Sequence, residues 1–329
     1  MKYILVLGYG WSGSGAVVDL LKEYDRTYQI PIEFRLIKDP GGLMDLRYNI
    51  VDRWDPLNVD IAIKKFMWHN KYLNQTSKNF PTRFGLGYAD ALGQDFENAS
   101  KTFLEGICEK QYQGNWFYFY YGQPSSKLFL GKLKGKFLKK DDKQEMYYSN
   151  VSGDDFDLLA KKYIDDIFAN HSNGKEYIVL DQAVPSQDPT QAKHYFNDYK
   201  TIIVDRDPRD IYCDLVNAHG LIGDELAKND DVDFFYRWFL SLRNKTDYQK
   251  DPKKYLRISF EDLLFDYEKT KAKIEAFLGF KPGEHTNQMA FLKPEVSCKN
   301  VGIWKQYKNQ EAMERIAELL PSYLSKYSK

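Results

Sequence analysis

The chain has few residues of the kinds that cross-link small secreted proteins or bind metals. Of its 329 residues, 3 are cysteine and 5 are histidine. Cys108, Cys213 and Cys298 are scattered and odd in number, which argues against a disulfide framework, and no metal-ligand spacing appears. We therefore expect a protein without a bound metal in a reducing compartment, the cytoplasm.

Long apolar runs and an excess of one charge are also lacking. The opening segment, MKYILVLGYG, holds five consecutive apolar residues, which is too short for a signal peptide or an anchor, so no integral membrane segment is expected. Lysine plus arginine and aspartate plus glutamate both number 47. Bulk electrostatics therefore gives no support to a nucleic-acid partner.

Short apolar runs alternate with helical patterns. This alternation predicts an α/β fold, with a parallel β-sheet flanked by helices on both faces. The expected strands are Tyr3–Leu7, Ile30–Ile37, Tyr177–Leu180, Thr201–Val204 and Tyr255–Ser259. The expected helices are Ala16–Tyr24, Phe156–Ala169, Thr190–Phe196, Ile211–Ala218, Val232–Asp247, Glu268–Leu278 and Glu311–Tyr327.

About 140 residues separate the second expected strand from the third, which is too many for a simple crossover. We interpret residues 58–150 as a mostly helical cap inserted into a single domain that spans 1–329. Within it, the stretch from Lys127 to Lys140 carries six lysines and no acid. Such a run is a solvated face, a site for an anionic glycan, or a surface for peripheral membrane contact.

The stretch LVLGYGWSGSGAVV has the form of a phosphate-binding loop, with a strand, a glycine-rich turn and a helix. Backbone N–H groups and the helix dipole make an anion site there without a charged side chain. ATP-binding loops end in Gly-Lys-Ser/Thr, but Gly15 is followed by Ala16. The dinucleotide pattern matches at the glycines, yet no acid ends the second strand, since Glu33 lies within it and Asp39 beyond it.

Three later segments, in order, complete a pattern: TIIVDRDPRDIYCDLV (201–216), YLRISFEDLLFDYEKTKAKIEAFLGF (255–280) and CKNVGIWKQY (298–307). Together with the N-terminal loop, this order resembles the sulfotransferase family. Its members transfer a sulfuryl group from 3′-phosphoadenosine-5′-phosphosulfate to an alcohol or amine, on a fold related to the P-loop NTPases. The resemblance covers roughly residues 1–40 and 175–329; the cap matches no family we can name.

The resemblance implies a site for the nucleotide. The loop would bind the 5′-phosphosulfate, and an arginine at a strand end would bind the 3′-phosphate. Trp11 stands where the family has a lysine or arginine, and Asp214 stands where it has a serine. The residues carried over for the nucleotide are Trp11, Ser12, Gly13, Ser14, Gly15, Ala16, Arg206 and Lys299.

Sulfuryl transfer needs a base for the acceptor proton and cations for the developing charge. Glu33 with Arg35 resembles the Glu-x-Arg of protein-tyrosine sulfotransferases, in which the glutamate is the proposed base. Asp181 is the rival, because it ends the third expected strand at the edge where such sheets bind ligands. Because Trp11 carries no charge, we expect another cation to act: Arg35 first, then Lys38 and Lys299.

The expected function is therefore transfer of a sulfuryl group to a hydroxyl of a glycan, a lipid-linked sugar or a small metabolite. Two alternatives stay open. One is a nucleotide-dependent phosphotransferase with a degenerate loop, which the missing Gly-Lys-Ser/Thr disfavours. The other is a nucleotide-binding protein without catalysis, favoured by departures from the family at Trp11, Gln182 and Asp214.

Overall fold

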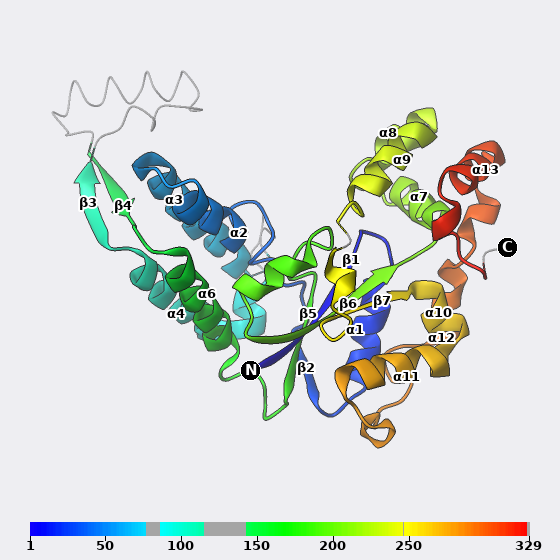
Figure 1. Ribbon diagram of the computed structural model, residues 1–329, viewed down its shortest axis with the longest axis horizontal. Helices are drawn as coiled ribbons and strands as arrows, with labels where there is room; N and C mark the ends of the chain where they lie inside the picture. Colours follow the sequence, from blue (N-terminus) through cyan, green and yellow to red (C-terminus); the bar gives the residue numbers. More distant parts are fainter. Residues whose placement is uncertain (77–85, 115–142, 246, 328–329) are drawn as a thin grey trace.

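A five-stranded sheet, all of whose pairs are parallel, lies at the centre of the protein (Figure 1). The computed structural model describes residues 1–76, 86–114, 143–245 and 247–327. The strand order is β2-β5-β1-β6-β7, which confirms the predicted α/β class. The strands of this sheet are β1 (Lys2–Gly8), β2 (Thr27–Gln29), β5 (Tyr177–Asp181), β6 (Asp198–Asp205) and β7 (Tyr255–Ser259).

Side chains of the central strand β1 alternate between two apolar clusters, as the period of a strand requires. Leu5 and Leu7 belong to one cluster, whereas Ile4 and Val6 belong to the other. All four are fully buried. Covering both faces of a parallel sheet removes its apolar residues from water, and this explains why β1 is an almost unbroken apolar run.

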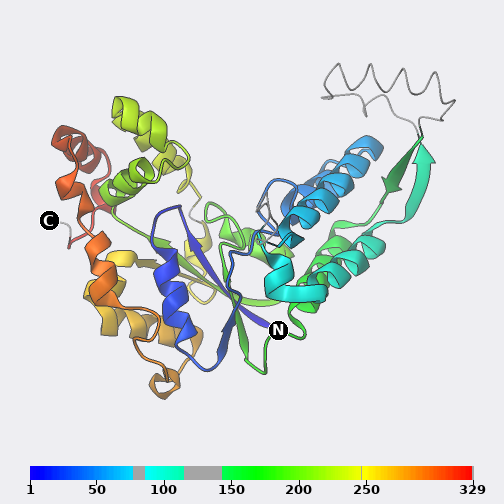
Figure 2. The same ribbon diagram turned by 180° about the vertical axis from the view of Figure 1, so that it is seen from behind.

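Two groups of helices cover the sheet from opposite sides, and Figure 2 shows both from behind. One face packs against α1 (Ser14–Lys22), α10 (Phe260–Phe265) and α11 (Tyr267–Leu278), and the short α12 (Pro294–Ser297) lies against α10. The other packs against α2 (Leu43–Arg47), a π-helical turn (Tyr48–Asp52), α3 (Pro56–Asn74), α4 (Tyr88–Ile107) and α6 (Gly153–Phe168).

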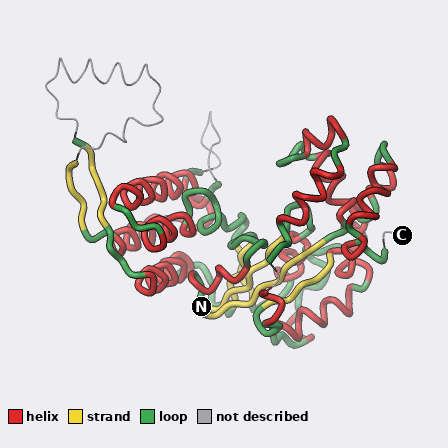
Figure 3. The backbone as a smooth tube through the Cα atoms, turned by 45° about the horizontal axis from the view of Figure 1, so that its top comes forward, coloured by secondary structure: helices red, strands yellow, loops and turns green. Residues whose placement is uncertain are grey.

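A third apolar cluster lies beyond the carboxyl ends of β6 and β7. It joins α7 (Pro208–Asn217), α8 (Gly223–Asn229), α9 (Val232–Ser241) and α13 (Gln310–Leu319). Figure 3 shows this group and the α3–α4–α6 group on opposite sides of the sheet. The edge of the sheet where a ligand is expected therefore lies between two helical walls.

The helices α3 and α4, which lie largely within residues 58–150, continue the core of the sheet together with α6, which follows that segment. Buried side chains of α3, α4 and α6 share one cluster with β1 and β5. An antiparallel pair, β3 (Lys110–Gly114) and β4 (Gln144–Tyr148), projects from these helices. The basic run from Lys127 to Lys140 lies outside the described residues. No described helix combines the length and apolar character needed to cross a membrane.

The prediction of a strand at Ile30–Ile37 is wrong. β2 ends at Gln29, and residues 30–37 form bends and turns. Pro31 lacks the N–H that a strand ladder needs. The apolar side chains are nevertheless buried, because Phe34 and Ile37 pack into the core from irregular backbone. Burial without a strand produced the misleading apolar pattern.

Three expected helices also differ in the structure. In place of the helix expected at residues 190–196 there is a 3₁₀ turn at Pro189–His194. α9 ends at Ser241, and α13 ends at Leu319. The last ends early because Pro321 cannot continue a helix. Its short 3₁₀ turn brings residues 322–326 beside β6 and β7, where they line a cavity together with Asp205, Arg206 and Arg257.

Candidate active site

The glycine loop connects β1 to α1 as the sequence predicts. Gly13 has φ +81°, and a Cβ there would lie 2.3 Å from the ring of Phe260, so both backbone angle and space demand glycine. Ser12 is buried, and its hydroxyl accepts a hydrogen bond from the Tyr9 N–H (3.1 Å). No side chain caps α1, whose first residue is Ser14. The start of this helix therefore suits an anion.

A hydrogen-bonded chain joins the start of α1 to the loop after β2. The side-chain amide of Gln182 donates to the hydroxyl of Ser14 (3.0 Å). Lys38 in turn donates from Nζ to Oε1 of Gln182 (3.1 Å). Gln182 sits directly after β5 in the left-handed region, with φ +58°. A non-glycine residue in this conformation is held by its surroundings, here by the bond from its N–H to the Val6 carbonyl (2.9 Å).

Asp181, the last residue of β5, lies beside this chain. Its Oδ1 is buried and has no hydrogen-bond partner among the described residues. Burial, and next the charge of Glu33, raise the pKa of the Asp181 carboxyl to about 7, although Lys38 acts to lower it. A carboxyl group that titrates near neutrality can accept a proton at physiological pH.

Glu33 and Arg35 contact each other from the irregular loop rather than from a strand face. Arg35 binds Glu33 through Nη1 (2.8 Å) and Asp39 through Nε (2.8 Å). The side chain of Glu33 is 50% exposed. Together with Ile32, Tyr72 and Leu86, these three residues line a cavity of about 350 Å³.

Lys38 has different partners from Arg35. Burial, and next the nearby Arg35, lower the pKa of the Lys38 amine. Its ammonium reaches the Gln182 chain, whereas the guanidinium of Arg35 has two carboxylate partners. Of the three cations proposed to act in place of Trp11 (Arg35, Lys38 and Lys299), Lys38 is thus the one that the described contacts link to the start of α1.

Arg206, at the carboxyl end of β6, is buried, and its side chain is 3% exposed. Its Nη1 donates to the Trp11 carbonyl (2.9 Å) and to Asp214 (2.5 Å), and its Nη2 donates to the Asn300 carbonyl. Arg206 therefore ties the loop, α7 and the 298–302 segment together. Within the described residues, Lys299 is exposed and forms no ion pair.

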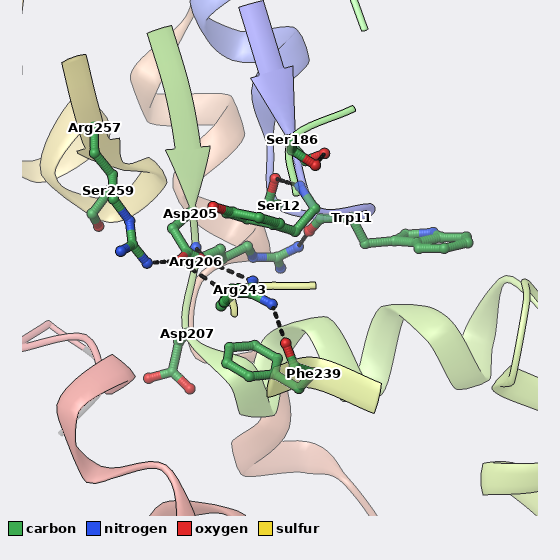
Figure 4. A network of polar contacts seen from close by, with 12 residues as sticks. Trp11, Ser12, Ser186, Asp205, Arg206, Asp207, Phe239, Arg243, Arg257 and Ser259 are labelled. Carbon is green, nitrogen blue, oxygen red and sulfur yellow. Dashed lines mark hydrogen bonds and ion pairs between the residues drawn. The ribbon is translucent and has the colours of Figure 1, made fainter. Parts of the chain in front are cut away.

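Trp11 supplies a backbone contact to this network, not a side-chain one. Figure 4 shows its indole ring extending away from Arg206. The ring lies against Gly220, where an added Cβ would meet it at 2.3 Å, and it packs on the third apolar cluster. The side chain of Trp11, where the resemblance led us to expect a cation, therefore has an apolar environment.

A second buried network flanks Arg206 (Figure 4). Asp205 accepts hydrogen bonds from Arg243 (2.7 and 3.1 Å) and from Arg257. Burial acts to raise the pKa of Asp205, but Arg243 and Arg257 hold it below its ordinary value. The Arg243 guanidinium lies 3.5 Å from the ring centroid of Phe239 and 4.1 Å from that of Tyr9.

Sequence reasoning missed these partnerships. Arg243 and Arg257 were not proposed, because no motif marks them. Arg206 and Asp214 are eight residues apart, and their pairing is suggested in retrospect by an acid at the family's serine position. The described residues contain no group of three or more histidine, cysteine, aspartate or glutamate side chains suited to a metal.

Comparisons with known proteins give structural likenesses only. No family model matches the chain, and no curated protein does. The chain is similar to the sulfotransferase domain of the Synechococcus PCC 7002 olefin synthase (14% identity, TM-score 0.41, 97% of this chain and 94% of that one). It is also similar to the sulfotransferase domain of the curacin biosynthetic pathway (11% identity, TM-score 0.43, 99% of this chain and 99% of that one). Another similar structure is that of retinol dehydratase, solved with androsterone and the inactive cofactor PAP (17% identity, TM-score 0.37, 99% of this chain and 82% of that one).

Proposed function

We propose that the protein transfers a sulfuryl group from an adenine nucleotide phosphosulfate, the class that includes 3′-phosphoadenosine-5′-phosphosulfate, to a hydroxyl acceptor. The observation that carries the proposal is the chain from Ser14 through Gln182 to Lys38, with Asp181 beside it. It places a helix start, a cation and a carboxyl of raised pKa at one edge of the sheet.

The 5′-phosphosulfate of the donor binds at the start of α1. N–H groups there offer hydrogen bonds to its oxygens, and the helix dipole favours its charge. Lys38 supplies the positive charge that Trp11 lacks. Because Lys38 already contacts the Gln182 side chain, it lies one hydrogen-bonded residue away from Ser14. A fixed cation near the bridging oxygen stabilises the charge that develops as the S–O bond breaks.

Asp181 acts as the general base. The acceptor oxygen forms a bond to sulfur, its proton passes to the Asp181 carboxylate, and the bond from sulfur to the bridging oxygen breaks. The nucleotide leaves with that electron pair. Glu33, the other candidate, is half exposed and bound to Arg35. We assign Glu33 and Arg35 to the wall of the acceptor site instead.

The acceptor lies against α3, in the cavity that Glu33 and Arg35 share with Tyr72. Tyr72 stacks on Trp68, with ring centroids 6.1 Å apart and planes 9° apart, and Trp68 is 66% exposed. Aromatic faces beside carboxylates suit a sugar ring or a flat metabolite that carries a hydroxyl. In this proposal the helices of residues 58–150 form the cap over the acceptor.

A binding protein without catalysis is the second candidate. The pairing of Arg206 with Asp214 favours it, because that pairing departs from what a catalytic relative is expected to keep. Turnover decides between the two.

Thermal shift with adenosine 3′,5′-bisphosphate, adenosine 5′-phosphate, ATP and NAD tests the nucleotide class. The proposal predicts stabilisation by one or both adenosine mono- and bisphosphates above that by ATP or NAD. Incubation with a phosphosulfate donor and a panel of phenols, alcohols and monosaccharides should then yield a sulfate ester, detected by mass. Selective stabilisation by ATP would instead favour a phosphotransferase.

A further inference from the structure

We propose that the donor site is built for an adenosine 5′-phosphosulfate that lacks a 3′-phosphate, because the carboxylate of Asp214 fills the place on Arg206 that the 3′-phosphate would need. This inference rests on the proposed function and names its donor more narrowly. Asp214 is, in this account, the residue that sets donor specificity.

The guanidinium of Arg206 is surrounded by acceptors that belong to the protein. Its Nη1 is shared between Asp214 and the Trp11 carbonyl, and its Nη2 binds the Asn300 carbonyl. One face lies 5.3 Å from the ring centroid of Phe260. A phosphate needs donors on several of its oxygens. Only Nε of Arg206 is without a hydrogen-bond partner among the described residues.

Charge at this place also disfavours a 3′-phosphate. The charge of Arg206 is balanced by Asp214, so an added phosphate would meet a carboxylate and two carbonyl oxygens. Like charges held close together repel each other strongly where water is largely excluded. The side chain of Arg206 is 3% exposed and that of Asp214 is 31% exposed, so the repulsion would act in a partly buried site.

Neighbouring cations do not replace Arg206. Arg209 binds both oxygens of Asp207 (2.9 and 2.8 Å) and stacks on Trp304, 3.9 Å from the ring centroid. Lys299 is exposed, and a solvated lysine supplies little specific binding to a phosphate. The 5′ end of the site, by contrast, keeps its helix start and Lys38.

The reaction balances without the 3′ group. The acceptor oxygen forms a bond to sulfur, its proton goes to Asp181, and the bond from sulfur to the bridging oxygen breaks. Adenosine 5′-phosphate leaves with the electron pair of that bond. The 3′ position takes no part in bond making, so its loss changes recognition alone.

Calorimetry of the full chain with adenosine 5′-phosphate and adenosine 3′,5′-bisphosphate tests the inference. Wild type should bind the two within about threefold of each other, or favour the monophosphate. Asp214→Ser frees the guanidinium and should bind the bisphosphate roughly 10- to 100-fold more tightly than wild type does, with monophosphate affinity unchanged. Asp214→Asn, which keeps the shape and removes the charge, should shift in the same direction.

Asp224→Ser is the matched control, because Asp224, on the neighbouring α8, is 78% exposed and pairs with His219. It should behave as wild type. If wild type binds the bisphosphate at least about tenfold more tightly than the monophosphate, the inference is wrong while the proposed function stands. Binding of neither nucleotide by wild type would overturn the proposed function, and this inference with it.

Discussion

Lys38 donates a hydrogen bond from Nζ to Oε1 of Gln182 over 3.1 Å, and the two residues are 144 positions apart in the chain. Through the Gln182 amide this contact reaches Ser14, where α1 begins. A cation from the loop after β2 is thereby linked to the proposed anion site, which has no lysine of its own. The proposed chemistry depends on this link and on the carboxyl of Asp181 beside it.

Asp181→Asn should abolish transfer and stabilise the fold at high pH. The folded-state pKa of Asp181 is raised to about 7 from an ordinary value near 4, so the fold favours the protonated form. The protonated Asp181 therefore contributes to the free energy of unfolding. This contribution is fully present below about pH 4 and is lost as pH rises through about 7. At pH 8 the variant should therefore exceed wild type by roughly 2–4 kcal/mol in free energy of unfolding.

Denaturant titrations at pH 4 and pH 8, with rates measured across the same range, check both effects. The stability difference should shrink towards pH 4, and the wild-type rate should rise with an apparent pKa near 7. Asp224→Asn, at an exposed position on α8, serves as control and should change neither quantity. If the Asp181→Asn variant keeps the wild-type rate of transfer, Asp181 is not the general base and Glu33 becomes the candidate.

Gly13→Ala should damage the loop far more than Gly10→Ala does. Both glycines have φ near +80°, so both substitutions carry the same backbone strain of about 1 kcal/mol. A Cβ at Gly10 has nothing within 4 Å, whereas one at Gly13 would lie 2.3 Å from Phe260. The Gly13 variant should lose roughly 2–4 kcal/mol of stability and most nucleotide affinity. Thermal melts with and without nucleotide measure both, and equal losses in the two variants would refute the packing account.

Arg243→Lys should destabilise the protein although the charge is kept. The guanidinium binds both oxygens of Asp205, donates to the Phe239 carbonyl (3.0 Å) and stacks on aromatic rings. A lysine cannot reproduce this planar fork, so the buried carboxylate loses a partner. We expect a loss of about 2–4 kcal/mol by urea denaturation. Arg315→Lys, at an exposed pair, should stay within about 0.5 kcal/mol of wild type. Wild-type stability in Arg243→Lys would show that the fork is unnecessary.

The sheet could be predicted from sequence because strands buried on both faces are apolar runs. β1, β5 and β6 are of this kind, whereas β7, at the edge of the sheet, alternates buried with partly buried residues. The error at residues 30–37 has the same origin. That segment buries Phe34 and Ile37 without a ladder, and apolar content alone cannot distinguish the two cases.

The candidate site could be predicted only in part. The glycine loop follows the end of β1 and Asp181 ends β5, and the apolar runs of these strands can be recognised in the sequence. The contacts of Lys38 with Gln182 and of Arg206 with Asn300 join segments 144 and 94 residues apart. Tertiary packing alone sets such contacts. The loop after β2 brings Lys38 inward and leaves Glu33 half exposed, and no periodicity in the sequence marks that difference.

Lys38→Ala is the variant that tests the central claim most directly. Transfer of labelled sulfate from an adenosine phosphosulfate to the best acceptor of the panel would be measured beside nucleotide affinity by calorimetry. Removing the cation should lower the rate roughly 10²–10³-fold, the effect of losing one preorganised group, while nucleotide affinity changes less than about tenfold. Lys65→Ala, at an exposed position on α3, should match wild type. A Lys38→Ala protein that transfers sulfate at the wild-type rate would contradict the account.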